Sequence, residues 1–91
     1  MTVTVIEDRP AGEFRATLDG QPAGLIGYRR DGDVFDLLHT EVDGAFEGHG
    51  VGTGLVRQAL AIVRTQAGRV RPSCPFVRRY LEQHPGEADL E

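Results

Sequence analysis

The sequence predicts a small domain of the α+β or α/β class, built on a mixed five-stranded sheet with two helices. In the N-terminal half, short segments of alternating polar and apolar residues are separated by turn residues, which is typical of antiparallel strands. From Gly52 onward, apolar residues recur at helical spacing. We therefore expect an antiparallel meander of four strands, a crossover helix, a fifth strand parallel to the fourth, and a C-terminal helix.

The first two strands are predicted at residues 3–7 and 13–18. Residues 13–18 alternate strictly, so Phe14, Ala16 and Leu18 share one face. Residues 3–7 have a mixed pattern, which is typical of an edge strand with both faces partly covered. An Asp-Gly pair follows the second strand and favours a tight hairpin.

The third and fourth strands are predicted at residues 23–29 and 34–42, joined by the Arg-Asp-Gly-Asp turn between them. His39 is a polar residue within the mostly apolar fourth strand. Two interpretations of this residue remain open, namely a half-buried histidine with satisfied hydrogen bonds and a general base.

A helix is predicted from Gly52 or Thr53 to Ala67, with Gly68 as its left-handed C-terminal cap. A short strand at residues 69–72 follows, and the helix before it makes this strand a right-handed parallel partner of the fourth. Pro75 suits the first position of a second helix. The residues expected on one face of that helix are Phe76, Val77, Tyr80, Leu81 and His84. Residues 87–91 are predicted to be a frayed tail.

The length of 91 residues predicts a single domain spanning residues 1–91. The net charge of −4 argues against nucleic acid as a partner, because phosphate neutralisation requires a basic excess. No apolar run approaches the roughly 18–20 residues that a membrane helix needs. The single cysteine rules out intrachain disulfides and favours a reducing, cytoplasmic location.

The residue types that are missing exclude several kinds of site. All ten basic residues are Arg, so Schiff-base chemistry and a lysine-containing phosphate loop are excluded. The only serine, Ser73, lacks the flanking glycines of a nucleophile elbow. The three histidines, His39, His49 and His84, are far apart in the sequence and lack neighbouring ligands, so we expect no metal site.

A glycine-rich loop, Gly48-His49-Gly50-Val51-Gly52-Thr53-Gly54, joins the fourth strand to the first helix. Glycines allow close approach of a ligand to the backbone, and a helix N-terminus attracts anions. Phosphate or pyrophosphate is therefore the expected ligand. The spacing does not match the dinucleotide-binding pattern. A flexible turn that binds nothing is the alternative interpretation.

Cys74 is predicted at the N-cap of the second helix, directly before Pro75. A thiolate there would be stabilised by the free N–H groups of the first turn, and Arg71 and Arg78 would add positive charge. The alternative is a small buried apolar side chain without a chemical role.

Three segments together resemble a known family. They are His39-Thr40-Glu41-Val42, the glycine-rich loop, and Arg71-Pro72-Ser73-Cys74-Pro75-Phe76-Val77. The chain is similar over nearly its whole length to the minimal, roughly ninety-residue N-acetyltransferase domains of the GNAT type. The resemblance implies a GNAT-like three-layer core and a binding site for acetyl-CoA.

The resemblance also implies which residues bind the cofactor. The CoA pyrophosphate would lie on the loop formed by Glu47, Gly48, His49, Gly50, Val51, Gly52 and Thr53. The pantetheine arm would follow the backbone of Thr40, Glu41 and Val42. Glu47 departs from the family pattern, because an acidic residue replaces the usual Gln or Arg and places a negative charge near the diphosphate.

In this family branch Cys74 occupies the position regarded as catalytic. Its thiolate would either accept the acetyl group and pass it to an amine, or act as a base while the amine attacks acetyl-CoA. His39 or Glu41 would be placed to assist proton removal. The amine acceptor is unidentified, and a non-catalytic acyl-CoA-binding or interaction module is the alternative function.

Overall fold

The computed structural model of the chain describes residues 2–91. Its strands are β1 (Val3–Asp8), β2 (Glu13–Leu18), β3 (Gln21–Asp31), β4 (Val34–Val42) and β5 (Arg69–Pro72). Its helices are the short 3-10 helix η1 (Gly44–Phe46), α1 (Val51–Thr65) and α2 (Pro75–Gln83). Within residues 2–91, no helix has both the length and the apolar character that crossing a membrane requires.

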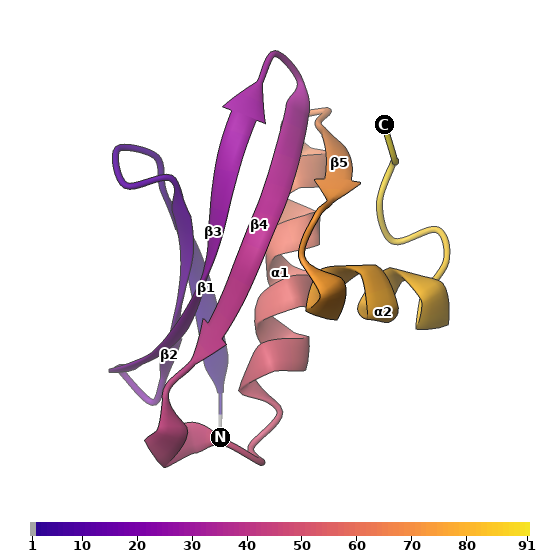
Figure 1. Cartoon of the computed structure of the whole chain (residues 1–91). Coiled ribbons are helices and arrows are strands. Elements are labelled where there is room, and N and C mark those ends of the chain that lie inside the picture. Colours follow the sequence, from indigo (N-terminus) through magenta and orange to yellow (C-terminus); the bar gives the residue numbers. More distant parts are fainter. Residues whose placement is uncertain (1) are drawn as a thin grey trace.

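The five strands form one sheet in the order β1-β2-β3-β4-β5 (Figure 1). Strands β1 to β4 pair antiparallel, and β5 pairs parallel to β4, with Val34 opposite Arg69 and Leu37 opposite Pro72. The predicted meander, crossover helix and parallel fifth strand are thus confirmed. The end of β4 that extends beyond β5 leads through η1 to the glycine-rich loop and the N-terminus of α1.

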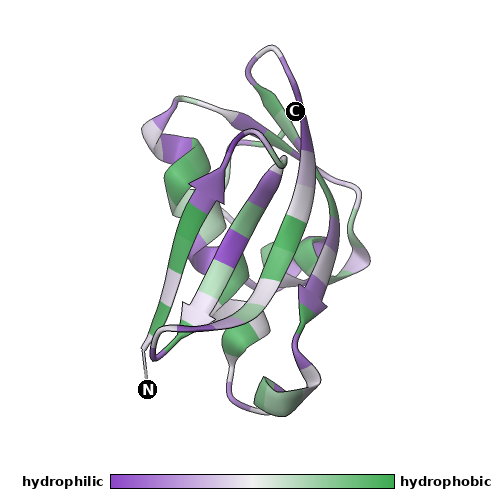
Figure 2. Cartoon of the chain, turned by 90° about the vertical axis from the view of Figure 1, so that its left-hand side faces the viewer, coloured by the Kyte–Doolittle hydropathy of each residue, from purple (hydrophilic) through white to green (hydrophobic). Residues whose placement is uncertain are grey.

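Both helices lie on the same face of the sheet (Figure 1). The molecule therefore has two layers, and the expected three-layer core is wrong in this respect. Its smallest extent is 19 Å, which corresponds to one sheet and one layer of helices. Figure 2 shows the other face of the sheet, which carries no helix and on which polar and apolar residues follow one another along the strands.

The core lies between the sheet and the helices. The apolar stripe of α1 faces inward, with Leu55, Val56 and Ala59 fully buried. Across from it, the rings of Phe14 and Tyr28 stack with their centroids 4.7 Å apart. The strict alternation in β2 and the helical period in α1 are what place these side chains in one cluster.

A side chain of α1 forms hydrogen bonds with the backbone of the edge strand β1. The amide group of Gln58 donates a hydrogen bond to the carbonyl oxygen of Val3 at 2.7 Å and accepts one from the N–H of Val5 at 3.2 Å. Unpaired backbone groups on an edge strand invite association with other strands, and Gln58 satisfies two of them. This contact also fixes the orientation of α1 relative to the sheet.

Helix α1 ends in a Schellman motif. The N–H of Gly68 bonds to the carbonyl oxygen of Val63, and the N–H of Ala67 bonds to that of Arg64, each at 3.0 Å. The left-handed residue is Ala67, with φ of 54°, so the prediction that Gly68 takes this conformation is wrong. Gly68 is instead required for packing, because a Cβ there would lie 2.6 Å from Cε1 of Phe35.

Two predictions about the C-terminal region are also wrong. Phe76 was predicted on one face of α2 with Val77 and Tyr80, but those two residues are buried whereas Phe76 is 39% exposed. Residues 87–91 do not fray, because Leu90 forms a parallel bridge with Val70 of β5. The N–H of Val70 bonds to the carbonyl oxygen of Asp89, and the N–H of Glu91 bonds to that of Val70. The unpaired outer edge of β5 thus holds this segment in place.

Candidate active site

Cys74 lies where β4 and β5 stop pairing. β5 pairs with β4 as far as Leu37 and Pro72, whereas β4 continues to Val42. The N–H of Cys74 then donates a hydrogen bond to the carbonyl oxygen of Leu37 at 2.8 Å. Cys74 is the N-cap residue of α2, as predicted, and its side chain makes no capping hydrogen bond. The thiol is therefore held at a fixed point beside the free edge of β4, with 3% of the residue exposed.

A β-bulge in β4 decides which side chains face this thiol. Gly27 of β3 is opposite His39, but Tyr28 is opposite Leu37, so Leu38 is an extra residue in β4. The extra residue changes the alternation of side chains, and Thr40 faces the helices. The hydroxyl oxygen of Thr40 lies 3.4 Å from the Sγ atom of Cys74. Thr40, predicted only through its backbone, thus contributes its side chain as well.

His39 and Glu41 point to the opposite, helix-free face of the sheet. The Nε2 atom of His39 lies 3.2 Å from a carboxylate oxygen of Glu41, and both side chains are exposed. Gly27 makes room for the imidazole, because a Cβ at Gly27 would lie 2.3 Å from Cε1 of His39. The structure therefore does not bring these two side chains to the face on which the Cys74 thiol lies.

A buried acidic residue positions the segment before Cys74. Asp36 accepts a hydrogen bond from the hydroxyl of Ser73 at 2.5 Å and lies 3.6 Å from a guanidinium nitrogen of Arg71. Arg71 also makes a bidentate pair with Glu91 at 2.5 and 2.6 Å. The hydrogen bonds from Arg71 hold the pKa of Glu91 below its ordinary value. Because two carboxylates neutralise Arg71, it does not provide the positive charge that we expected near Cys74.

Arg78 also differs from the expectation. Its guanidinium group donates hydrogen bonds to the carbonyl oxygens of Pro72 and Ser73, at 3.2 and 3.3 Å. The N–H of Arg78 bonds to the carbonyl oxygen of Cys74 at 3.0 Å and so closes the first turn of α2. Arg78 therefore fixes the chain on both sides of the thiol.

The glycine-rich loop has an open backbone with two glycines in the left-handed conformation. Gly48 and Gly50 have φ of 82° and 74°, in the left-handed region, and nothing lies within 4 Å of a Cβ built on either residue. Gly50 is the N-cap of α1 and provides no side-chain hydrogen bond. Within residues 2–91, the first three N–H groups of α1 have no acceptor, and its first turn contains no acidic residue. An anion can therefore bind these groups from solvent.

The other loop residues are arranged around this N-terminus. Glu47 ends η1, and its N–H bonds to the carbonyl oxygen of Gly44. Glu47, His49 and Thr53 are exposed, whereas Val51 is buried in the core. The ring of His49 lies edge-on to that of Phe46, with centroids 6.5 Å apart. Val51 therefore offers only its backbone to a ligand.

Phe76 connects the loop to the Cys74 segment. A Cβ built on Gly52 would lie 2.9 Å from Cζ of Phe76, so the phenyl ring lies against the first turn of α1. Phe76 follows Cys74 by two residues, and the loop and the thiol are therefore at the same end of the helical layer. The absence of a side chain at Gly52 permits this contact.

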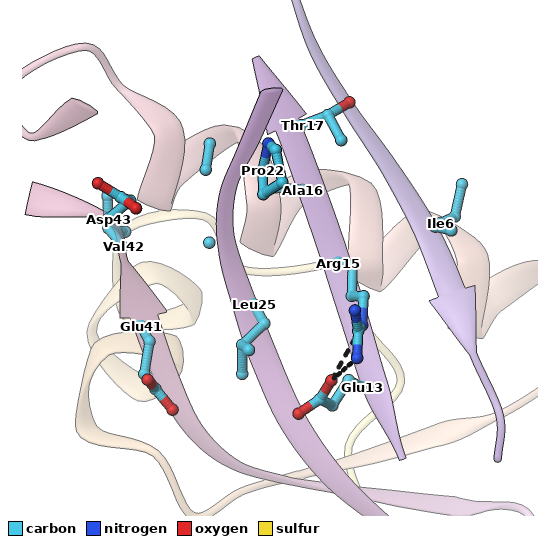
Figure 3. Close-up of a pocket in the computed structure, with 12 residues that line it drawn as sticks. Ile6, Glu13, Arg15, Ala16, Thr17, Pro22, Leu25, Glu41, Val42 and Asp43 are labelled. Carbon is cyan, nitrogen blue, oxygen red and sulfur yellow. Dashed lines mark hydrogen bonds and ion pairs between the residues drawn. The ribbon is translucent and has the colours of Figure 1, made fainter. Parts of the chain in front are cut away.

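A shallow groove of about 490 Å³ lies on the helix-free face of the sheet (Figure 3). Ile6, 60% exposed, and Leu25 provide apolar surface. Glu41 and Asp43 lie on one side of the groove, and Arg15 pairs with Glu13 on the other. No cluster of three metal-ligating side chains was found in the part of the chain that the structure describes.

Comparisons with known proteins identify the family. Residues 13–90 match the sequence profile described as GCN5-related N-acetyl-transferase. The chain belongs to this family. The predicted membership is thereby confirmed for most of the chain, including β4, the glycine-rich loop and α2.

Relatives of this GCN5-related family member span most of its length. Protein NATD1 of Gallus gallus is 29% identical over 91 residues, which covers 98% of this chain and 83% of the relative. Protein NATD1 of Homo sapiens has the same identity and is covered to 80%. The NMR solution structure of a GCN5-like protein from Staphylococcus aureus superimposes with a TM-score of 0.69. At 22% identity, covering 97% of this chain and 90% of that one, this likeness shows the fold.

Sequence reasoning missed the Asp36–Ser73 contact and the bulge at Leu38. A charged residue inside the apolar run of residues 34–38 was the signal for a buried, paired acid. Nothing in the sequence alone indicated the bulge, because it becomes visible only when β3 and β4 are aligned.

Proposed function

We propose that the protein transfers an acetyl group from acetyl-CoA to an amine, with Cys74 as the catalytic residue. The observation that carries the proposal is the contact between Phe76 and Gly52, which brings the glycine-rich loop and the Cys74 segment together at one end of the molecule. Family membership supports acetyl-CoA as the donor. The acceptor is defined here only as an amine.

The residues present fit the donor. The open space above Gly48 and Gly50 and the free N–H groups of Val51, Gly52 and Thr53 suit a diphosphate. The edge of β4 at Thr40, Glu41 and Val42, beyond the last residue paired with β5, would hold the pantetheine arm through its backbone. Acetyl-CoA supplies an activated acetyl thioester at this point.

Two routes use Cys74 in different ways. In the first, the Cys74 thiolate forms a bond to the acetyl carbon while the CoA thiolate leaves. The amine then attacks the acetyl carbon, the bond to the Cys74 sulfur breaks, and the amine's proton passes to that sulfur, which yields an amide and the free thiol. In the second, the Cys74 thiolate takes a proton from the amine while the amine nitrogen attacks the acetyl carbon, the bond to the CoA sulfur breaks, and the CoA thiolate leaves as the amide forms. In both routes the hydroxyl of Thr40 is placed to donate a hydrogen bond to the sulfur.

Glu47 opposes donor binding. Its carboxylate is exposed at the loop that would hold the diphosphate, and like charges repel. We expect Glu47→Gln to bind acetyl-CoA several-fold more tightly than the wild type, with a larger effect at low salt. A Glu82→Gln variant, which removes the same charge from the surface of α2, is the control. Equal effects of the two substitutions would show that only net charge matters.

A non-catalytic acyl-CoA-binding or interaction module is the second candidate function. The burial of the Cys74 thiol, together with the charge of Glu47, favours this alternative. A module of this kind would bind acetyl-CoA and release no CoA in the presence of amines.

The deciding experiment combines calorimetry with mass spectrometry. Titration with acetyl-CoA and desulfo-CoA should show micromolar binding. Incubation with acetyl-CoA and an amine panel should release CoA in the wild type and not in Cys74→Ala. An added acetyl mass on the wild-type protein, absent from Cys74→Ala, would indicate the acetyl-cysteine route. Transfer by Cys74→Ala at the wild-type rate would remove Cys74 from the mechanism.

A reducing compartment is part of this proposal. A catalytic thiol must remain reduced, and Cys74 is the only cysteine, so the protein has no internal disulfide partner for it. We therefore propose a cytoplasmic location. No proposed step involves nucleic acid or a membrane.

A further inference from the structure

The groove on the helix-free face of the sheet crosses four strands (Figure 3). Ile6 is opposite Arg15, and Arg15 is opposite Leu25. Leu25 in turn is opposite Glu41. These four residues form a row across β1, β2, β3 and β4, and all of them line the groove. The groove therefore runs across the sheet, from apolar surface at β1 to a carboxylate at β4.

Carboxylates lie on both sides of the apolar residue Leu25 (Figure 3). Glu41 and Asp43, at the end of β4, line one side of the groove, and Glu13 of β2 lines the other. Two strand spacings and two residues along the strand separate Glu13 from Glu41. Strands are about 4.8 Å apart and each residue advances about 3.3 Å, so these two backbone positions are about 10–12 Å apart.

Each of these three carboxylates uses only one of its oxygens in hydrogen bonds and ion pairs within residues 2–91. Both contacts from Arg15 to Glu13 are made to Oε1, at 3.0 Å. The contact of His39 with Glu41 is made to Oε2, at 3.2 Å. Asp43 accepts a hydrogen bond from a backbone N–H of η1 through Oδ1, at 2.9 Å. The second oxygen of each carboxylate can therefore accept a hydrogen bond from a bound cation.

The groove has an excess of negative charge around an apolar centre. Three carboxylates and one guanidinium group line it. The guanidinium group of Arg15 also lies 3.4 Å from Asp8, so two carboxylates share its positive charge. Between the charged groups, Leu25 is half-buried, and Ile6 is exposed at the far end of the row. Charge complementarity therefore favours a ligand that is cationic at its ends and apolar in its middle.

We propose that this groove binds a linear diamine or polyamine that carries an ammonium group at each end. One ammonium group bonds to Glu41 and Asp43 and the other to Glu13, while the methylene chain lies over Leu25. An ammonium group has three N–H donors, which suits the two carboxylates at one end of the groove. The inference goes beyond the proposed function, because the site lies on the face opposite the Cys74 thiol and involves no acetyl-CoA.

Titrations of the full chain, followed by NMR chemical shifts without acetyl-CoA, test this site. The ligands are α,ω-diaminooctane, which spans the distance between the two sides when extended, α,ω-diaminopropane, which is too short, and octylamine, which has one ammonium group. We expect diaminooctane to bind about two- to fivefold more tightly than either of the others, because it forms an ion pair at both ends. Added salt should reduce this preference. The shifts should be centred on Leu25 and Glu41 and not on the glycine-rich loop.

Substitutions of the lining residues make the test specific. The double variant Glu41→Gln, Asp43→Asn should lose the preference for diaminooctane over octylamine, as should Glu13→Gln, and Asn at position 43 can still cap η1. Arg15→Gln should bind diaminooctane about twofold more tightly, because it removes the positive charge from the lining. Glu82→Gln removes a carboxylate from α2 and should leave the preference unchanged. Circular dichroism melting confirms that each variant is folded.

The preference for diaminooctane, together with its loss in the double variant and in Glu13→Gln, supports the inference. Absence of binding, equal binding of diaminooctane and octylamine, or an equal loss of preference in Glu82→Gln overturns it. Tighter binding of a capped Lys-Gly-Lys peptide than of diaminooctane would assign the groove to a partner protein and overturn the inference as well. None of these outcomes affects the proposed function, and Cys74→Ala should bind diaminooctane as the wild type does.

Discussion

The Sγ atom of Cys74 lies 3.4 Å from the hydroxyl oxygen of Thr40, and a bulge at Leu38 makes this contact possible. Without the extra residue, regular alternation would direct Thr40 toward the helix-free face, where His39 and Glu41 now lie. The bulge in β4 therefore directs the side chain of Thr40 toward the thiol and those of His39 and Glu41 toward the helix-free face.

The first prediction concerns this contact. Thr40→Val keeps the shape of the side chain and removes the hydroxyl, so a charged sulfur would lose a hydrogen bond donor. A hydrogen bond to a charged group contributes about 1.5–3 kcal/mol, and we expect acetyl transfer to slow by roughly tenfold or more. Thr17→Val on the helix-free face is the control. An unchanged rate in Thr40→Val would show that the hydroxyl takes no part in the reaction.

The second prediction concerns the contact between Gly52 and Phe76. A Cβ at Gly52 would lie 2.9 Å from Cζ of Phe76, and overpacking of this kind costs about 1–3 kcal/mol. Gly52→Ala should therefore destabilise the protein in urea denaturation. With Phe76→Ala present, the same substitution should stabilise it by about 0.5–1 kcal/mol, because Ala favours the helix over Gly.

Gly54 is the matched control for this double-mutant cycle. A Cβ at Gly54 would meet Val3 at an ordinary 3.5 Å, so Gly54→Ala should be stabilising with or without Phe76. If Gly52→Ala destabilises equally in both backgrounds, the phenyl ring is not what limits this position.

The third prediction concerns the end of α1. Ala67 has φ of 54°, a conformation that costs a residue with a Cβ about 1–2 kcal/mol. Ala67→Gly should therefore raise the free energy of unfolding by about 0.5–1 kcal/mol. Gly68→Ala should lower it by about 1–3 kcal/mol, since the new methyl group would clash with Phe35 and Val63. Thermal melts of both variants would check the opposite signs.

The fourth prediction concerns acid stability. The carboxylate of Glu7 accepts hydrogen bonds from the hydroxyl of Tyr28 at 2.5 Å and from the amide of Gln66 at 2.7 Å. Burial alone would raise the pKa of Glu7, but these bonds and the nearby charge of Arg9 outweigh it and hold the pKa below its ordinary value of 4.5. The stabilisation is therefore complete above pH 4.5 and is lost as pH falls through the lowered pKa.

Urea denaturation at several pH values tests the predicted pH dependence of the stabilisation by Glu7. Glu7→Gln should be less stable than the wild type by about 1–2 kcal/mol near neutral pH, and the difference should shrink below about pH 4. Burial and the bond to Glu7 raise the pKa of Tyr28 to about 12, so the same contact is lost at the alkaline end as the pH rises from 10 toward 12. A constant difference between pH 3 and 7 would contradict the role of the charge.

Much of the fold could be predicted because its signals are local. The alternation in β2, the helical period in α1 and the Pro75 that begins α2 each depend on a few neighbouring residues. The position of Cys74 at the N-cap of α2 could be predicted in the same way, since Pro75 defines the first residue of the helix. Family membership, predicted from three short segments, is likewise confirmed.

The predictions that are wrong concern positions whose conformation depends on residues far apart in the chain. Gly68 was predicted as the left-handed cap, because only glycine takes that conformation without cost. Ala67 takes it instead. Gly68 is needed for a different reason, because Phe35 of β4 leaves no space for a side chain at that position. Helical spacing predicted Phe76 on the same face of α2 as Val77, yet Val77 is buried whereas Phe76 is exposed and lies against Gly52.

By itself, the sequence determined the order of the elements, the glycine-rich loop before α1 and the placement of the thiol at the start of α2. Only the tertiary structure decided that Thr40 faces the thiol, that the charge of Arg71 is neutralised, and that Phe76 lies against Gly52. The physical reason is that periodicity and capping act within a few residues. Side-chain contacts depend on strand register and helix packing, which are set by the whole core.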